Sequence, residues 1–332
     1  MGKYNDEARL REQVGLLIQS LRSDSDGTRE SAIVQLSLLG SKAAPQLTST
    51  LLAALEERER GASLHPGTER AIEGIVRALG MIADPPCAAA LAKALPMPEA
   101  AMALGKLGTS TALGLLIQEI PKWYVRPNPL GSGPEEKQEL ARRAFSYFGQ
   151  EAVTKLVEAA KGSSVPVGLC ACVVFQEAKS ASSVSGLLDL LESAELSVRT
   201  ASFRSLAKLG APIPQQFVTR ALLGTLKSST EMVVGLPLEQ VLEAADEDTL
   251  LRFYFGFEWE ATGASEGRRL MERYIARKGS DVVPKLITYV EAGTPNERAL
   301  AARLLEKATS LEPQIPGQEE VEVAPATEGQ AT

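Results

Sequence analysis

The chain has 332 residues and a formal net charge of −7, but residues 311–332 hold five Glu and no Lys or Arg, so the remainder carries −2. A body this close to neutral excludes the concentrated basic surface that displaces counterions from a nucleic-acid backbone. Charged residues interrupt any apolar run in the first dozen residues, and three cysteines do not make a disulfide framework in a chain of this size. We therefore expect a cytoplasmic protein without a leader or a membrane-inserted segment.

Apolar residues recur at helical spacing along most of the chain, and strand signals are weak. Gly and Pro separate the apolar stretches, which predicts an all-α protein built from helical pairs. Taken in chain order, the predicted helices span residues 7–22, 28–39, 45–60, 68–79, 86–95, 98–107, 110–120, 135–148, 151–160, 166–178, 182–193, 196–209, 214–227, 230–245, 248–260, 265–278, 281–292 and 295–309. They amount to about nine pairs.

Several of the predicted second helices end in the same dipeptide, an apolar residue followed by Gly. It occurs at positions 39–40, 79–80, 107–108, 148–149 and 209–210. Since a helix commonly ends with Gly in the left-handed conformation, each dipeptide predicts a helix C-terminus. The repetition predicts stacked helical pairs, none of which buries its apolar face without its neighbours.

Two segments carry the fullest form of the repeat. Residues 196–210 read LSVRTASFRSLAKLG, and residues 26–40 read DGTRESAIVQLSLLG. Both resemble the second-helix pattern of HEAT repeats, particularly the short type found in phycobilin lyases and many bacterial proteins. The resemblance covers most of residues 14–310 and is degenerate between 212 and 262. It implies a right-handed α-solenoid forming one continuous domain over residues 1–310, followed by the acidic segment 311–332, whose composition predicts disorder.

Two insertions interrupt the repeat, at residues 61–67 and 121–134. The second holds four Pro and two Gly, and we expect neither insertion to be helical. Both fall between the two helices of a pair, which would place them on one edge of a solenoid, roughly 20 Å apart. That edge is a candidate partner-binding surface, because Trp123, Tyr124 and Arg126 are residue types enriched at binding hot spots. The alternative is that Trp123 folds back onto the helices and pins the loop.

Arginine recurs eleven residues before the terminal Gly, at Arg29, Arg199 and Arg268. A ladder of arginines on the inner, concave face would attract an acidic partner, which makes Arg29 and Arg199 further candidate binding residues. The alternative is structural, with each Arg bound to carboxylates or helix-end carbonyls between adjacent repeats.

The sequence offers no candidate catalytic residue and no metal site. His65 is the single His and lies beside Pro66 in a predicted exposed loop, where no catalytic partner can be predicted. Cys170 and Cys172 are two positions apart on a predicted helix, so their side chains diverge and we expect both to be buried. The aromatic residues between 253 and 259 predict either a packing cluster or an exposed groove.

These observations predict a non-enzymatic scaffold or adaptor that binds another protein on its concave face or on the insertion edge. We expect no cofactor, no metal and no nucleic-acid partner. The resemblance leaves one alternative, a helper similar to the phycobilin lyases that handles a chromophore. A solenoid DNA glycosylase is a third alternative, and the nearly neutral net charge of residues 1–310 argues against it.

Overall fold

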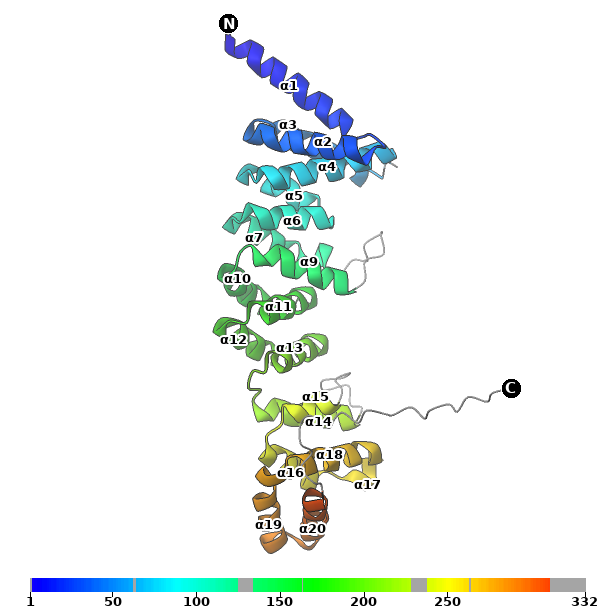
Figure 1. Cartoon of the computed structure of the whole chain (residues 1–332), viewed down its shortest axis with the longest axis vertical. Coiled ribbons are helices and arrows are strands. Elements are labelled where there is room, and N and C mark those ends of the chain that lie inside the picture. Colours follow the sequence, from blue (N-terminus) through cyan, green and yellow to red (C-terminus); the bar gives the residue numbers. More distant parts are fainter. Residues whose placement is uncertain are drawn as a thin grey trace, which may run out of the picture. The chain divides into compact units, whose positions relative to one another are not determined.

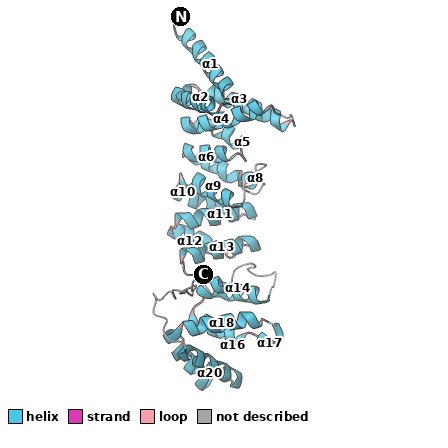
Figure 2. Cartoon of the chain, turned by 45° about the vertical axis from the view of Figure 1, so that its right-hand side comes forward, coloured by secondary structure: helices cyan, strands magenta, loops and turns pink. Residues whose placement is uncertain are grey.

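The computed structural model describes residues 2–61, 64–124, 134–162, 164–227, 238–262 and 264–310. All regular secondary structure in these ranges is helical, as Figure 2 shows, so the all-α prediction is confirmed for them. Arg126 and the acidic segment 311–332 lie outside the described residues, and what the sequence predicts for them stays a prediction.

Contacts between Cα atoms divide the chain into two compact units. Unit 1 comprises Met1–Phe217 with Thr230–Leu236, and unit 2 comprises Val218–Ser229 with Pro237–Thr332. The single continuous domain expected over residues 1–310 stays a prediction.

Unit 1 consists of two rows of helices joined in pairs. The first helices of the pairs are α1 (Gly2–Ser20), α3 (Ala44–Glu59), α5 (Ala88–Lys93), α7 (Ser110–Gln118), α10 (Gln150–Ala160) and α12 (Ala181–Leu190). The second helices are α2 (Asp26–Leu39), α4 (Pro66–Ile82), α6 (Pro98–Leu107), α9 (Pro134–Ser146), α11 (Val165–Ala178) and α13 (Leu196–Leu209). Each first helix contacts the next first helix and each second helix contacts the next second helix, so the pairs stack in chain order (Figure 1). The short helices η1 (Gly40–Lys42), η2 (Pro85–Cys87) and α8 (Ile120–Trp123) lie in the connections.

A residue with positive φ, here called the terminal residue, follows each second helix of unit 1. After α2, α6, α9 and α13 the terminal residue is a glycine, at Gly40, Gly108, Gly149 and Gly210. After α4 it is Ala83 and after α11 it is Lys179, with φ of 55° and 49°. The prediction that α4 ends at residues 79–80 is therefore wrong, because this helix continues to Ile82.

Gly80 has a different role, inside α4. A Cβ atom at this position would lie 2.7 Å from the Cβ atom of Ala103 in α6. Gly105 repeats the arrangement one pair later, since its Cβ atom would lie 2.7 Å from the carbonyl oxygen of Ala144 in α9. Both glycines precede a terminal residue by three positions, and they let successive second helices approach closely there.

The two insertions contain helical residues that the sequence did not predict. Pro66 is the first residue of α4, and His65 caps that helix through Nδ1, which accepts a 3.1 Å hydrogen bond from the amide of Gly67. Residues 120–123 form the single turn α8, and α9 begins at Pro134. The prediction that neither insertion contains helix is therefore wrong. Pro is tolerated in the first turn of a helix, where the backbone N–H has no partner to lose.

Unit 2 holds the later helices, with α18 at the centre of their contacts. They are α14 (Gln215–Lys227) from Val218 onward, α15 (Leu238–Glu243), α16 (Glu247–Gly256), α17 (Trp259–Thr262), α18 (Ser265–Arg277), η3 (Gly279–Asp281), α19 (Val283–Ala292) and α20 (Pro295–Ser310). α18 contacts α15, α16, α17 and α20. The single helix predicted over 248–260 is wrong, because Phe257 has an extended backbone, with φ −88° and ψ 133°, and separates α16 from α17.

Aromatic packing accounts for this break. Tyr254, Phe257 and Trp259 are buried, and Nε1 of Trp259 donates a 2.9 Å hydrogen bond to the carbonyl oxygen of Tyr254. The ring centroids of Phe257 and Trp259 lie 4.6 Å apart. Phe255 is half-buried, and its ring centroid lies 4.3 Å from that of Tyr289. The aromatic residues therefore form a packing cluster, one of the two alternatives that the sequence left open.

Glu272 of α18 is a buried carboxylate with an exposed fraction of 1%. Tyr254 donates a hydrogen bond to its Oε1 atom at 2.6 Å, and Arg268 donates to the same oxygen at 3.2 Å. From α20, Arg303 at 3.3 Å and Lys307 bind its Oε2 atom. Burial by itself would raise the pKa of Glu272, but hydrogen bonds from Lys307 and Tyr254 and the charges of Lys307 and Arg303 outweigh it, so that pKa lies below its ordinary value. An ionic centre thus joins α16, α18 and α20.

Candidate functional site

The structure places Trp123 inside unit 1. Its side chain is 3% exposed, and its Nε1 atom donates a 3.2 Å hydrogen bond to the carbonyl oxygen of Leu116 in α7. Its ring packs edge-on against that of Tyr124, with centroids 5.9 Å apart, and burial raises the pKa of Tyr124. Trp123 therefore folds back and pins α8 to α7, which is the structural alternative for this residue.

Arg29 and Arg199 occupy equivalent places in two repeats and make equivalent contacts. Arg29 donates a hydrogen bond to the carbonyl oxygen of Ser23, and Arg199 donates one to that of Ser193, both at 2.7 Å. Each carbonyl lies in the turn just before the helix that carries the arginine. The two arginines thus bind helix-end carbonyls, and the structure does not bring them together, since α2 and α13 are not neighbours in the stack.

Another set of surface residues shares a register when the second helices are aligned on their terminal residues. Two positions before the terminal residue lie Leu38, Met81, Lys106 and Tyr147. Six positions before it lie Val34, Arg77, Met102 and Arg143. The two positions are one turn apart, so they share a face on each helix. We call these residues of α2, α4 and α6, together with Arg143 of α9 and Tyr147 directly after α9, the apolar–basic strip.

The strip holds most of the exposed large apolar side chains found among the described residues. Those side chains are Leu16, Val34, Leu38, Met81, Tyr147 and Ile287. The four within the strip are 80% exposed at Leu38, 51% at Met81, 49% at Tyr147 and 47% at Val34. Single exposed apolar residues are ordinary on a protein surface, whereas a group at one register on adjacent helices forms the kind of patch that binds a partner.

Basic residues separate the apolar ones along the strip. Arg77 binds Glu30 of α2 through hydrogen bonds of 2.6 and 2.9 Å, and these bonds raise the pKa of Arg77. Arg143 pairs with Glu139, one turn earlier on α9, at 3.0 Å. Lys106 of α6 forms no ion pair with any residue that the structure describes. The strip therefore offers an uncompensated cation between its apolar side chains.

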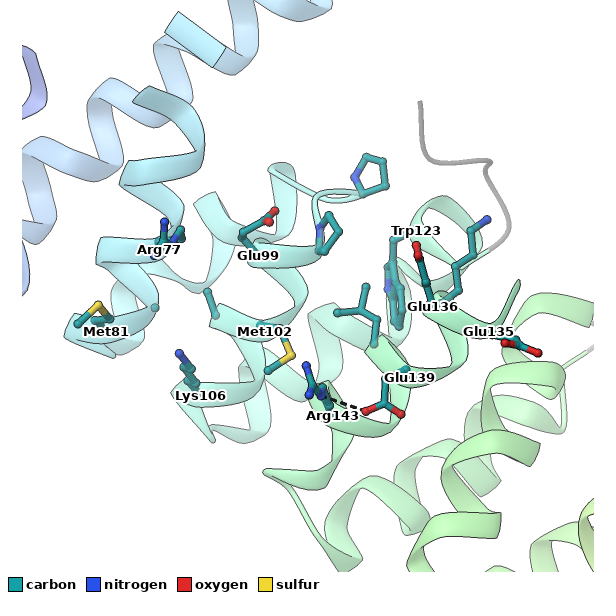
Figure 3. Close-up of a pocket in the computed structure, with 16 residues that line it drawn as sticks. Arg77, Met81, Glu99, Met102, Lys106, Trp123, Glu135, Glu136, Glu139 and Arg143 are labelled. Carbon is teal, nitrogen blue, oxygen red and sulfur yellow. Dashed lines mark ion pairs between the residues drawn. The ribbon is translucent and has the colours of Figure 1, made fainter. Parts of the chain in front are cut away.

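A cavity of about 730 Å³ opens along the strip (Figure 3). Its lining comes from α4, α6 and α9, with Pro96 and Trp123 of α8. Its acidic lining residues come from the N-terminal halves of α6 and α9 and are Glu99, Glu135, Glu136 and Glu139. Its basic lining residues include Lys106 and Arg143 from the C-terminal halves of the same helices, an arrangement that suits the helix dipole. Met102 lies between Glu99 and Lys106 in Figure 3, so on α6 the lining passes from acidic to basic across an apolar side chain. On α9, Lys137 lies among the glutamates of the lining.

The structure gives the cysteines a packing role. Cys87, Cys170 and Cys172 are buried free thiols, which confirms the positions expected for the last two. Burial raises the pKa of Cys172 to about 12, so it holds its proton at neutral pH. Within the described ranges, no group of three or more His, Cys, Asp or Glu is placed to hold a metal ion. In the same ranges, no helix has the length and apolar character that crossing a bilayer requires.

Alignment of the repeats on Gly conceals the strip. Because α4 continues to Ile82 and its terminal residue is Ala83, an alignment on Gly80 moves Met81 out of the register that it shares with Leu38 and Tyr147. The backbone finds the register, since Ala83 has the positive φ that Gly40, Gly108 and Gly149 have after the other helices. Burial alone does not find it, because Val76, four positions before Gly80, and Leu79, four positions before Ala83, are both buried.

No protein-family model matches the sequence, and no curated protein matches it. One solved structure to which the chain is similar is the crystal structure of an engineered protein. The two are 17% identical with a TM-score of 0.31, and the match covers 91% of this chain and 99% of the engineered protein. At that TM-score the likeness carries no argument about fold or function.

Proposed function

We propose that this chain is a non-enzymatic scaffold, a right-handed α-solenoid of HEAT type that binds another protein along the apolar–basic strip. The stacking of helical pairs in unit 1 supports the repeat architecture, in which the second helices line the concave face. The observation that carries the proposal is the common register of Leu38, Met81 and Tyr147. Three repeats present a large apolar side chain to solvent at the same place, which has a cost in solubility unless a partner covers it.

The strip suits an amphipathic helix of the partner. Second helices packed ~8–10 Å apart place strip residues of successive pairs about six residues of α-helix apart, at about 1.5 Å per residue. A helix lying across α4, α6 and α9 would therefore meet Met81, Lys106 and Tyr147 with side chains roughly two turns apart. Apolar residues of the partner would cover Met81 and Tyr147, and a carboxylate between them would pair with Lys106.

A cytoplasmic location is part of the same proposal. All three cysteines of the chain are free thiols. Thiols persist in this form in a reducing compartment, which supports the location without defining it.

Affinity capture from the native host, read by mass spectrometry, tests the proposal. The strip variant L38S/M81S/Y147S removes apolar side chains that are already exposed, so folding should be preserved. The control variant L16S/I287S removes exposed apolar side chains outside the strip. We expect the wild type and the control to capture the same partner and the strip variant to lose it. An identical set of captured proteins from all three would contradict the proposal.

A further inference from the structure

Three exposed arginines, Arg269, Arg273 and Arg277, follow one another at four-residue spacing on α18. Residues at this spacing share a face of the helix, and the helix rises about 6 Å from each to the next. None of the three forms an ion pair with a residue that the structure describes. We call them the arginine row.

Arginines elsewhere on helices of this chain show how such charges are compensated. Arg60 pairs with Glu56 one turn earlier at 3.5 Å, as Arg143 does with Glu139 at 3.0 Å. The arginine row has no such partner, and like charges at four-residue spacing repel each other. The row therefore weakens α18 as an isolated helix, and an anionic ligand would relieve that repulsion.

Glu272 leaves further positive charge on α18 and α20. Three cations, Arg268, Arg303 and Lys307, share this one buried carboxylate, so two positive charges stay uncompensated. The side chains of Arg303 and Lys307 are 55% and 42% exposed. Residues 264–310 as a whole contain nine Lys and Arg against six Asp and Glu, whereas residues 238–262 contain one Arg against seven Asp and Glu. The positive charge of unit 2 is therefore concentrated on the helices from α18 to α20.

We propose that the arginine row is a binding surface for an acidic peptide and that its occupant is this chain's own segment 311–332. The segment carries five Glu and no Lys or Arg. It follows Ser310 directly, at the end of α20, and α20 packs against α18 through the bonds of Arg303 and Lys307 to Glu272. The negative charge of the segment and its attachment to α20 both favour the arginine row as its binding surface.

The attachment brings the row within reach. Nine residues from Leu311 to Glu319 span up to about 30 Å, whereas the 13 residues of α18 are about 20 Å long. The tether that carries Glu319, Glu320 and Glu322 is therefore longer than the helix on which the row lies. A short tether also gives an effective concentration of about a millimolar, so weak ionic contacts are enough for occupancy.

The contact between the segment and the row is ionic and exposed, and it is therefore screened by salt and adds little to thermal stability.

Fluorescence resonance energy transfer within the full-length chain tests the proposal. Dyes on Ser265→Cys in α18 and Ala324→Cys in the acidic segment report the distance between them, and the buried native cysteines do not compete for the label. We expect high transfer at about 0.01 M ionic strength and loss of transfer at about 1 M, where the Debye length falls from about 30 to about 3 Å. The triple change R269Q/R273Q/R277Q should abolish the high-transfer state.

The matched control R9Q/R11Q/R60Q removes three exposed arginines from unit 1 and should leave transfer unchanged. Low transfer in the wild type at low ionic strength would overturn the proposal. Salt-dependent transfer that survives the loss of the arginine row would overturn it as well, because the segment would then dock elsewhere.

A binding measurement distinguishes this occupant from others. In a full-length chain whose five C-terminal Glu are replaced by Gln, the row is vacant, and a fluorescent peptide of residues 311–332 should bind at least ~10-fold more tightly than it binds the wild type. Adding R269Q/R273Q/R277Q to that chain should abolish binding of the peptide. If the chain with the neutral segment instead binds single-stranded oligothymidine more tightly than the peptide, the row belongs to nucleic acid and the proposal is wrong.

Discussion

In unit 1 successive second helices meet through small residues, whereas in unit 2 large aromatic and charged side chains hold α18. Gly80 faces Ala103 and Gly105 faces Ala144, so the backbones of α4, α6 and α9 approach closely. The next residue along each helix, Met81 after Gly80 and Lys106 after Gly105, belongs to the strip. In unit 2, by contrast, Glu272 and the aromatic cluster fill the contacts. The repeat register therefore defines the surface proposed for binding in unit 1, and the positive charge around the ionic centre accompanies the surface proposed in unit 2.

The largest expected loss of stability comes from replacing Trp123. The replacement tests whether the stability of unit 1 depends on this buried side chain. Trp123→Ala should lower the free energy of unfolding by about 3–5 kcal/mol, because it leaves a cavity and an unpaired carbonyl at Leu116. Leu38→Ala, at an exposed position of the strip, should change it by less than about 0.5 kcal/mol. Denaturant unfolding measures both. A stable Trp123→Ala variant with weakened partner binding would instead restore Trp123 as a hot spot on the insertion edge.

The second-largest loss of stability is expected from the ionic centre of unit 2. Glu272→Gln should lower the free energy of unfolding by about 2–3 kcal/mol at neutral pH, since it removes charged hydrogen bonds from three cations. The pKa of Glu272 is lower in the folded than in the unfolded chain, so this stabilisation is present above the unfolded pKa and is lost as pH falls through the folded one. The difference between wild type and variant should therefore shrink below about pH 4. The change Glu266→Gln, at an exposed position of the same helix, serves as control. An equal loss of stability from Glu266→Gln would contradict the claim that the buried ionic centre stabilises the fold.

A pair of glycine variants tests the close contact in unit 1. Gly105→Ala should cost about 1–2 kcal/mol net, because its methyl group would meet the carbonyl of Ala144 at 2.7 Å. Gly114→Ala in α7 meets nothing within 4 Å and should instead stabilise by about 0.5–1 kcal/mol through helix propensity. Thermal melting of the two variants should thus move in opposite directions. A shift of the same sign would mean that α6 and α9 are not in close contact.

The smallest expected effect concerns the end of α4. Ala83→Gly should raise the free energy of unfolding by about 1 kcal/mol, since Ala83 holds φ at 55°, where an L side chain is strained. The reverse change, Gly108→Ala at the equivalent place after α6, should lower it by a similar amount. Destabilisation by Ala83→Gly would show that α4 does not end there and would remove Met81 from the strip.

The helical class and most helix positions could be predicted from the sequence, because apolar spacing and Gly endings are local signals. The end of α4 could not, since Ala83 occupies a position where four of the other five second helices of unit 1 have Gly, and an Ala gives no local signal for a positive φ. The helix break at Phe257 could not be predicted either, because the fold is what brings together the aromatic rings that cause the break. The residue types of Trp123 and Tyr124 suggested binding, but their burial depends on α7, which residue type alone does not reveal.

Site-specific photocrosslinking in the native host tests the strip most directly. A benzophenone amino acid replaces either Leu38, 80% exposed within the strip, or Leu16, 60% exposed outside it. The account predicts a discrete covalent adduct with another protein from position 38 and none from position 16. Adducts of equal yield from both positions, or an adduct from position 16 alone, would contradict the assignment of the apolar–basic strip as the docking surface.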